Sequence, residues 1–206
     1  MQYPSKQDVE QVLEPLYSPI HSSFHSAFQQ LKQATVDSWA IFTTRSRASS
    51  FRDYLVHDLT DAFEQYDNIH RIEQRGMVLW VIEEKVALRI KKLDDNLVSS
   101  NHYTQQSLDF VNQQLLLPGI DEIIALNMGY VPNEIWTKID GIYITCPLGT
   151  RKVLWAIDIN DKIDSTQTTT ALYVDDEDEE ERRVRVRVKN QELFEGGYHN
   201  EAGGDN

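Results

Sequence analysis

The change of hydrophobic period near residue 69 constrains the fold more than any other feature of this sequence. Before it, apolar residues from Phe51 to Tyr66 recur at three- and four-residue steps, which predicts an amphipathic helix beginning at Ser50. After it, apolar and polar residues alternate from Ile69 to Leu93 with short polar turns between the runs, which predicts three antiparallel strands. A helix followed by three strands favours an α+β domain.

Further elements are predicted on both sides of this unit. Apolar residues at helical spacing predict two helices before residue 36, and a short apolar run predicts a strand at 39–44. Thr104 can cap another helix, and later strands are expected at 123–128, 142–146 and 153–159. The expected fold class is therefore α+β, with N-terminal helices packed on a mainly antiparallel sheet of about six strands. The expected core order is helix-strand-strand-strand-helix-strand.

Composition divides the chain into three predicted parts. These are an N-terminal helical segment (1–36), an α+β core domain (37–163) and a polar, acidic and largely disordered tail (164–206). Within the tail, Asp175–Glu181 is a run of seven acidic residues, interpreted either as a solvated segment or as a mimic of nucleic-acid charge that docks on a basic partner or on the chain's own basic strand. Alternating valines at 184–188 also allow a late strand that pairs with a sheet edge.

Charge and cysteine content limit the function classes. The formal net charge is -13, and residues 174–206 hold eleven acidic and five basic side chains, so the upstream part is moderately acidic too. Such a field repels phosphates, which disfavours general nucleic-acid binding. Cys146 is the only cysteine, which excludes an intramolecular disulfide and a cysteine-based zinc cluster. Because no export signal and no long apolar run is found, we expect a cytoplasmic protein without a membrane span.

The polar segment before the predicted helix start is the first candidate binding site. A helix N-terminus presents unpaired amide N–H groups and the positive end of the helix dipole, which favours a phosphate or carboxylate. The residues expected to bind the anion there are Arg45, Ser46, Arg47, Ser49 and Ser50. The alternative is that Ser50 only caps the helix, while the arginines are solvated or paired with Asp53 or Asp58.

A second basic segment lies on the predicted strand 86–93. Arg89 and Lys91, with Lys85 and Lys92 beside them, form the densest basic cluster in the part expected to fold. If this cluster met the arginines of the preceding segment, a local basic patch could oppose the acidic background and accept a phosphate-bearing ligand. The alternative is a solvated sheet face whose edge lysines discourage aggregation.

The order of elements between 50 and 128 also permits a metal-dependent nuclease of the PD-(D/E)XK type. Glu83, Glu84 and Lys85 supply a Glu-x-Lys pattern, but they fall at a strand junction, and the strand before them carries no acid. His21 and His25 share a helix face at ligand spacing without a third ligand. No metal site and no cofactor are therefore predicted, and enzymatic activity is left open.

One group of residues carries a resemblance to a known family. The residues are Leu88, Arg89, Ile90, Lys91, Lys92, Leu93, Leu117, Pro118, Gly119, Gly129, Tyr130 and Trp155. Over residues 39–159 the chain resembles a family of small bacterial proteins, without an assigned activity, from mobile or defence-associated regions. The resemblance implies a bacterial or phage setting and carries over no functional residue.

These observations together favour a non-enzymatic interaction or regulatory protein of bacterial or phage origin, for example a component of a toxin–antitoxin or phage-defence system. Such a protein would bind an anionic partner, either another protein or a phosphate-bearing ligand, through its basic segment and strand. The alternative is a nuclease-like enzyme with a degenerate core. The sequence predicts no oligomeric state.

Overall fold

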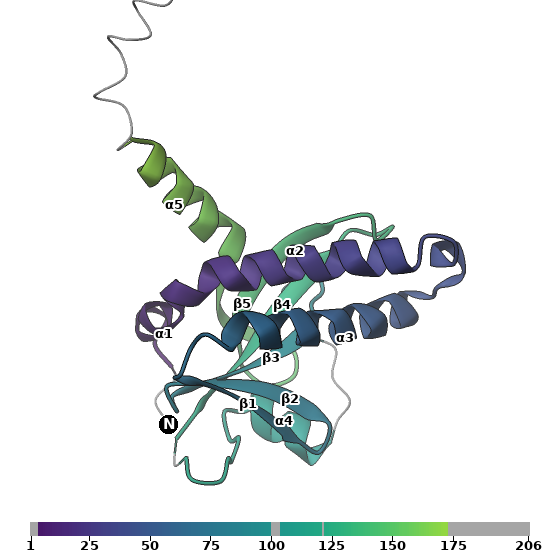
Figure 1. The fold of residues 1–206 in the computed structure, drawn as a ribbon. Helices are drawn as coiled ribbons and strands as arrows, with labels where there is room; N and C mark the ends of the chain where they lie inside the picture. The colour runs from purple at the N-terminus through teal and green to yellow at the C-terminus, as the bar shows by residue number, and fades with distance from the viewer. Residues whose placement is uncertain (1–3, 100–103, 121, 173–206) are drawn as a thin grey trace, which may run out of the picture. The chain divides into compact units, whose positions relative to one another are not determined.

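The six strands form one sheet in chain order, from β1 to β6 (Figure 1). The computed structural model describes residues 4–99, 104–120 and 122–172. The helical elements are α1 (Lys6–Leu13), η1 (Glu14–Leu16), α2 (Tyr17–Ala34), η2 (Trp39–Ile41), α3 (Thr44–Phe63), α4 (Gln105–Val111) and α5 (Ile159–Leu172). The strands are β1 (Ile69–Gln74), β2 (Met77–Ile82), β3 (Val86–Lys92), β4 (Ile124–Pro132), β5 (Ile139–Pro147) and β6 (Val153–Asp158). The expected α+β class with a mainly antiparallel six-stranded sheet is confirmed.

The pairing of β3 with β4 is parallel, whereas the other neighbouring strands are antiparallel. Parallel neighbours need a crossover connection, and α4 lies within the segment that provides it. The register pairs Val86 with Ile124 and Lys92 with Tyr130. The carboxyl ends of β3 and β4 therefore point the same way.

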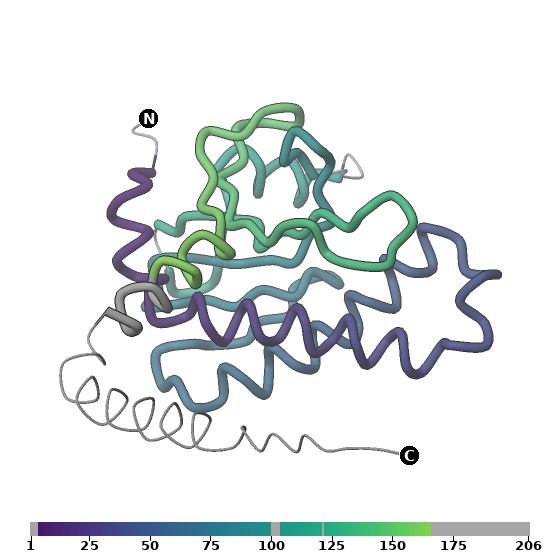
Figure 2. The backbone as a smooth tube through the Cα atoms, turned by 90° about the horizontal axis from the view of Figure 1, so that it is seen from above, coloured from purple at the N-terminus to yellow at the C-terminus, as the bar shows by residue number. Residues whose placement is uncertain are grey.

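Helices cover both faces of the sheet. In Figures 1 and 2, α2 and α3 run side by side, and their buried residues share one core with Trp80, Leu88 and Met128. The opposite face packs Leu79, Val81, Ala87 and Ala125 against Phe110 and Val111 of α4. Because both faces are covered, β2 is apolar throughout and β4 is apolar except at Asn127, as strands buried on two sides require.

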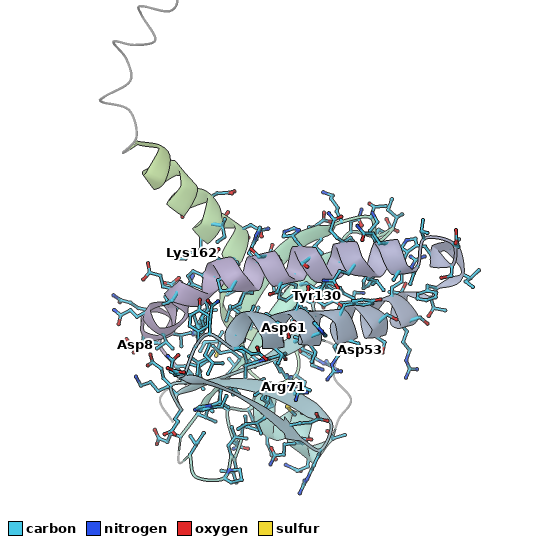
Figure 3. The ribbon with its side chains drawn as sticks, in the orientation of Figure 1. Asp8, Asp53, Asp61, Arg71, Tyr130 and Lys162 are labelled. Atoms are coloured by element: carbon cyan, nitrogen blue, oxygen red, sulfur yellow. The ribbon has the colours of Figure 1, made fainter. Side chains whose placement is uncertain are left out.

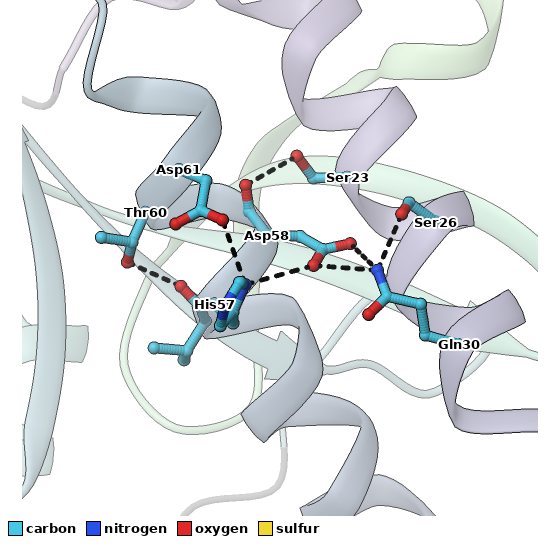
Figure 4. A network of polar contacts seen from close by, with 8 residues as sticks. Ser23, Ser26, Gln30, His57, Asp58, Thr60 and Asp61 are labelled. Carbon is cyan, nitrogen blue, oxygen red and sulfur yellow. Dashed lines mark hydrogen bonds and ion pairs between the residues drawn. The ribbon is translucent and has the colours of Figure 1, made fainter. Parts of the chain in front are cut away.

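Apolar and polar contacts both join α2 to α3. Phe28 meets the ring of Phe51 edge-on at 5.6 Å between centroids. On the outer side, Gln30 Nε2 donates to the carboxylate of Asp58 at 2.9 Å, and Ser23 Oγ donates to the Asp58 carbonyl oxygen at 3.5 Å (Figure 4). His57 Nδ1 lies 3.6 Å from the same carboxylate. The polar contacts fix the register of the helix pair that carries one wall of the site described below.

The predicted strand at 39–44 is wrong, and α3 begins earlier than Ser50. Residues 39–41 form a 3₁₀ turn, and Thr43 caps α3 by accepting a hydrogen bond from the Ser46 amide at 3.1 Å. Arg47 lies against the Trp39 ring and donates to the Trp39 carbonyl oxygen at 2.9 Å. These local contacts extend the helix through the polar run, because serine and arginine tolerate a helix once a cap is present.

The alternative of a solvated sheet face on β3 is wrong at Arg89. Arg89 is only 4% exposed, because α4 covers that face of the sheet. Toward the C-terminus, the described residues 164–172 complete α5, whereas the predicted acidic run and late strand lie outside the described residues. Among the described helices, none has the length and apolar character that a membrane span requires.

Candidate anion-binding site

One side of α3 carries basic and hydroxyl residues at helical spacing. Arg45, Ser49 and Arg52 follow each other at steps of four and three, so they lie on one stripe of the helix. With Ala48 between them, they line a hollow of about 910 Å³, here called the central hollow. The first wall of the site is therefore a helix side, whereas the sequence predicted a loop.

The end of β3 forms the second wall of the central hollow. Ile90, Lys91 and Lys92 line it, followed by Leu93 and by residues of the next loop, among them Asp94. Segments separated by about forty positions in sequence thus converge at one place. The structure brings the predicted residues Arg45, Ser49 and Lys91 together.

A gap in strand pairing creates a second hollow beside the first. The register pairs Trp80–Ile82 of β2 with Val86–Leu88 of β3, and the ends of both strands extend beyond it. In the gap, Arg75 of the β1–β2 turn and Arg89 of β3 line a hollow of about 280 Å³, here called the hairpin hollow. Arg52 and Lys91 line both hollows, so the two adjoin.

Burial and like charges perturb the cations between these hollows. Burial, together with the positive charges of Arg89 and Arg52, lowers the pKa of Lys91 to about 8. Burial also lowers the pKa of Arg89 to about 9. Arg89 is held in place by Asn127, whose Oδ1 accepts from its Nε at 2.9 Å, and by the Phe110 ring 3.7 Å from its guanidinium carbon. The site therefore holds positive charge at a free-energy cost.

Negative charge is scarce among the described residues of both hollows. Asp94 is the one carboxylate among the described residues that line them, and its Oδ1 accepts backbone amide hydrogens from Asn96 at 3.0 Å and Val98 at 2.8 Å. Arg52 lies 3.5 Å from Asp53, which Figure 3 labels on α3, but this pair is exposed and contributes little. Among the described lining residues, the cations thus outnumber the carboxylates.

Several predicted site residues lie elsewhere. Arg47 donates to the Trp39 carbonyl oxygen, and Ser46 Oγ lies 3.0 Å from Thr43 Oγ1 in the helix cap. Ser50 lies within α3. None of these three predicted site residues, Ser46, Arg47 and Ser50, lines either hollow. Sequence reasoning missed Arg52 and Arg75. The helical spacing of Arg45, Ser49 and Arg52 would have revealed Arg52, had the helix start been placed correctly. Nothing in the sequence pointed to Arg75, because its position depends on the strand gap.

The residues of the nuclease alternative form a turn. Glu83 and Glu84 adopt positive φ angles of 51° and 55° between β2 and β3, and Lys85 Nζ lies 2.8 Å from Glu83 Oε2. Neither Glu83 nor Lys85 lines either hollow. Within the described part of the chain, no group of three or more His, Cys, Asp or Glu residues is arranged to hold a metal ion.

Comparison with known proteins leaves the chain without an assigned family. No protein-family model, no curated protein and no solved structure matches it. What the protein binds is therefore inferred from the geometry and charge of the hollows.

Proposed function

We propose that the protein binds a phosphate-bearing ligand in the central hollow. The observation that carries this is the convergence of Arg45, Arg52, Lys91 and Lys92 from two elements on one hollow of a chain whose net charge is -13. Like charges held together and partly desolvated are unfavourable unless an anion compensates them. Burial and these neighbouring charges lower the pKa of Lys91.

A phosphate group fits this wall chemistry better than a carboxylate does. Guanidinium groups donate in a fork that matches phosphate oxygens, and lysine adds a mobile point charge. Ser49 and Thr150 place hydroxyl groups on the same lining. At about 910 Å³ the hollow is also large enough for a ligand that carries more than one such group.

The geometry favours binding over catalysis by the nuclease alternative, because the Glu83–Lys85 pair lies in a separate turn. We therefore keep the expectation of an interaction or regulatory protein whose partner is anionic. The bacterial or phage setting, and a part in a toxin–antitoxin or defence system, stay predictions from the resemblance alone.

Calorimetric titration with inorganic pyrophosphate tests the proposal. We expect the wild-type protein to bind at low salt, and Arg45→Ala and Lys92→Ala each to weaken binding about tenfold, because each removes one charge-assisted contact of roughly 1.4 kcal/mol. Lys85→Ala is the matched control, because it removes an exposed cation outside the hollows and changes net charge equally. Undetectable binding by the wild type, or equal losses in all three variants, would overturn the proposal.

A further inference from the structure

A third hollow continues the site beyond the loop that follows β3. It measures about 480 Å³ and is lined by Arg151 and Lys152 of the β5–β6 connection, by Val153 at the start of β6 and by Asn96. It is here called the outer hollow. Asp94 and Val98 line both the central and the outer hollow, so these two adjoin. The hairpin, central and outer hollows are therefore neighbours in that order.

The cations along this path are numerous, and most of them have no carboxylate partner among the described residues. Eight of the chain's 20 lysine and arginine residues line the three hollows. Within the described part of the chain, six of these form no ion pair with a carboxylate: Arg45, Arg75, Lys91, Lys92, Arg151 and Lys152. Asp94 is again the one described carboxylate on the lining. A compact anion in the central hollow would leave the cations at both ends uncompensated.

We infer that the three hollows form one basic track for an extended chain of phosphates, an assignment that rests on the proposed function of the central hollow. This chemistry is shared by the backbone of single-stranded nucleic acid and by inorganic polyphosphate. Phosphates repeated along a flexible chain can meet Arg75 at one end, Lys91 in the middle and Arg151 at the other. The acidic remainder of the chain repels the same ligand and so confines it to the track.

The lining of the track favours recognition of charge over recognition of bases. Tyr130 is the one aromatic residue among the described lining residues, and it is 2% exposed beneath α2 and α3 (Figure 3). Stacking of bases on exposed aromatic rings supplies much of the binding energy that bases contribute in single-strand binders, and the described residues of this lining offer no such ring. Affinity should therefore depend on the number of phosphates and on salt, and little on base identity.

A length series tests the track with the full chain. Fluorescence anisotropy would follow dye-labelled oligo(dT) of about 4, 8 and 16 nucleotides, lengths that bracket common single-strand sites. Inorganic polyphosphate of matched phosphate number would compete with each. We expect affinity, and the steepness of its salt dependence, to rise with length until the track is filled. Tighter binding of oligo(dT) would identify the ligand as single-stranded nucleic acid, and tighter binding of polyphosphate would identify it as inorganic polyphosphate. Both results support a track for an extended chain of phosphates.

Variants at the two ends separate this inference from the proposed function. Arg75→Ala and the pair Arg151→Ala/Lys152→Ala should weaken binding of the longest ligand about tenfold or more and leave pyrophosphate affinity unchanged, because pyrophosphate is too short to reach either end. The pair Lys85→Ala/Lys138→Ala is the control for net charge, since both lysines lie outside the track in exposed ion pairs. If pyrophosphate binds but length and end variants have no effect, the track is refuted and the central hollow stands. If neither ligand binds, both fail.

Discussion

Replacing Lys91 with methionine should stabilise the protein and weaken anion binding. Burial, with Arg89 and Arg52 nearby, lowers the pKa of Lys91 from 10.5 to about 8. At about 1.4 kcal/mol per pKa unit, this lowering of about 2.5 units corresponds to at most about 3.5 kcal/mol against the charged form. The variant should gain only part of this free energy, because the surrounding structure also relaxes. Methionine is chosen because its side chain is unbranched like that of lysine but carries no charge. We therefore expect the free energy of unfolding to rise by about 1–2 kcal/mol near pH 7, as when a functional site is relieved of a destabilising charge.

The sign of the pH dependence follows from the same pKa. The unfolded chain holds the Lys91 proton up to its ordinary pKa of 10.5, whereas the folded protein releases it near pH 8, so the unfolded state binds more protons between these values. The stability of the wild type relative to Lys91→Met must therefore rise as pH increases across this interval. Burial raises the pKa of Tyr17 and Tyr130, but these groups are common to both proteins, so the difference isolates Lys91.

Urea unfolding followed by tryptophan fluorescence, near pH 7 and near pH 10, measures both quantities. The advantage of Lys91→Met should be largest near pH 7 and shrink near pH 10. Lys85→Met is the control, and its exposed position predicts a change within about 0.5 kcal/mol. A destabilised Lys91→Met variant, or an advantage that is equal at both pH values, would show that Lys91 is not held at a cost. In the same pH range, pyrophosphate binding by the wild type should weaken as Lys91 loses its proton.

Three further outcomes are expected. Arg47→Ala should lower the free energy of unfolding by about 1–2 kcal/mol in urea titrations, because it loses the Trp39 ring and carbonyl, yet its pyrophosphate affinity should match the wild type. Gly129→Ala should destabilise by about 1–3 kcal/mol, since the added methyl group would overlap the buried Leu93 side chain; an unchanged melting temperature would contradict this. Cys146 should react with a thiol reagent only as fast as the protein unfolds, because burial raises its pKa to about 12; rapid labelling of the native protein would count against it.

The elements with strong periodicity were predictable from the sequence. The helix through Phe51 and the strands at 69–93 follow patterns that local burial dictates, and the structure contains both. The start of α3 was not predictable, because residues 45–50 form a polar run that is typical of a loop. The cap at Thr43 and the stacking of Arg47 on Trp39 nevertheless make this run helical. Local contacts of this kind shift helix ends without changing the fold class.

The convergence of charges was only partly predictable. Two basic segments were visible in the sequence, but whether they meet depends on which strand pairs with which, a long-range property that periodicity does not encode. Arg89 is one residue whose environment the sequence did not reveal. The alternation of apolar and basic residues allowed a solvated face there, whereas α4 covers that face. Arg75 is another, because its place in the site follows from where the pairing of β2 and β3 stops.

The short pairing of β2 with β3 means that few main-chain hydrogen bonds attach the β1–β2 hairpin to the rest of the sheet. Three residue pairs, Trp80–Ile82 with Val86–Leu88, join it to the rest of the sheet through the main chain. A phosphate chain that contacts both Arg75 of the β1–β2 turn and Lys91 of β3 would span the place where the main-chain pairing of β2 with β3 stops. A bound phosphate chain would then attach the hairpin more firmly to the rest of the sheet. The backbone amides of the hairpin should therefore exchange more slowly in the complex than in the free protein.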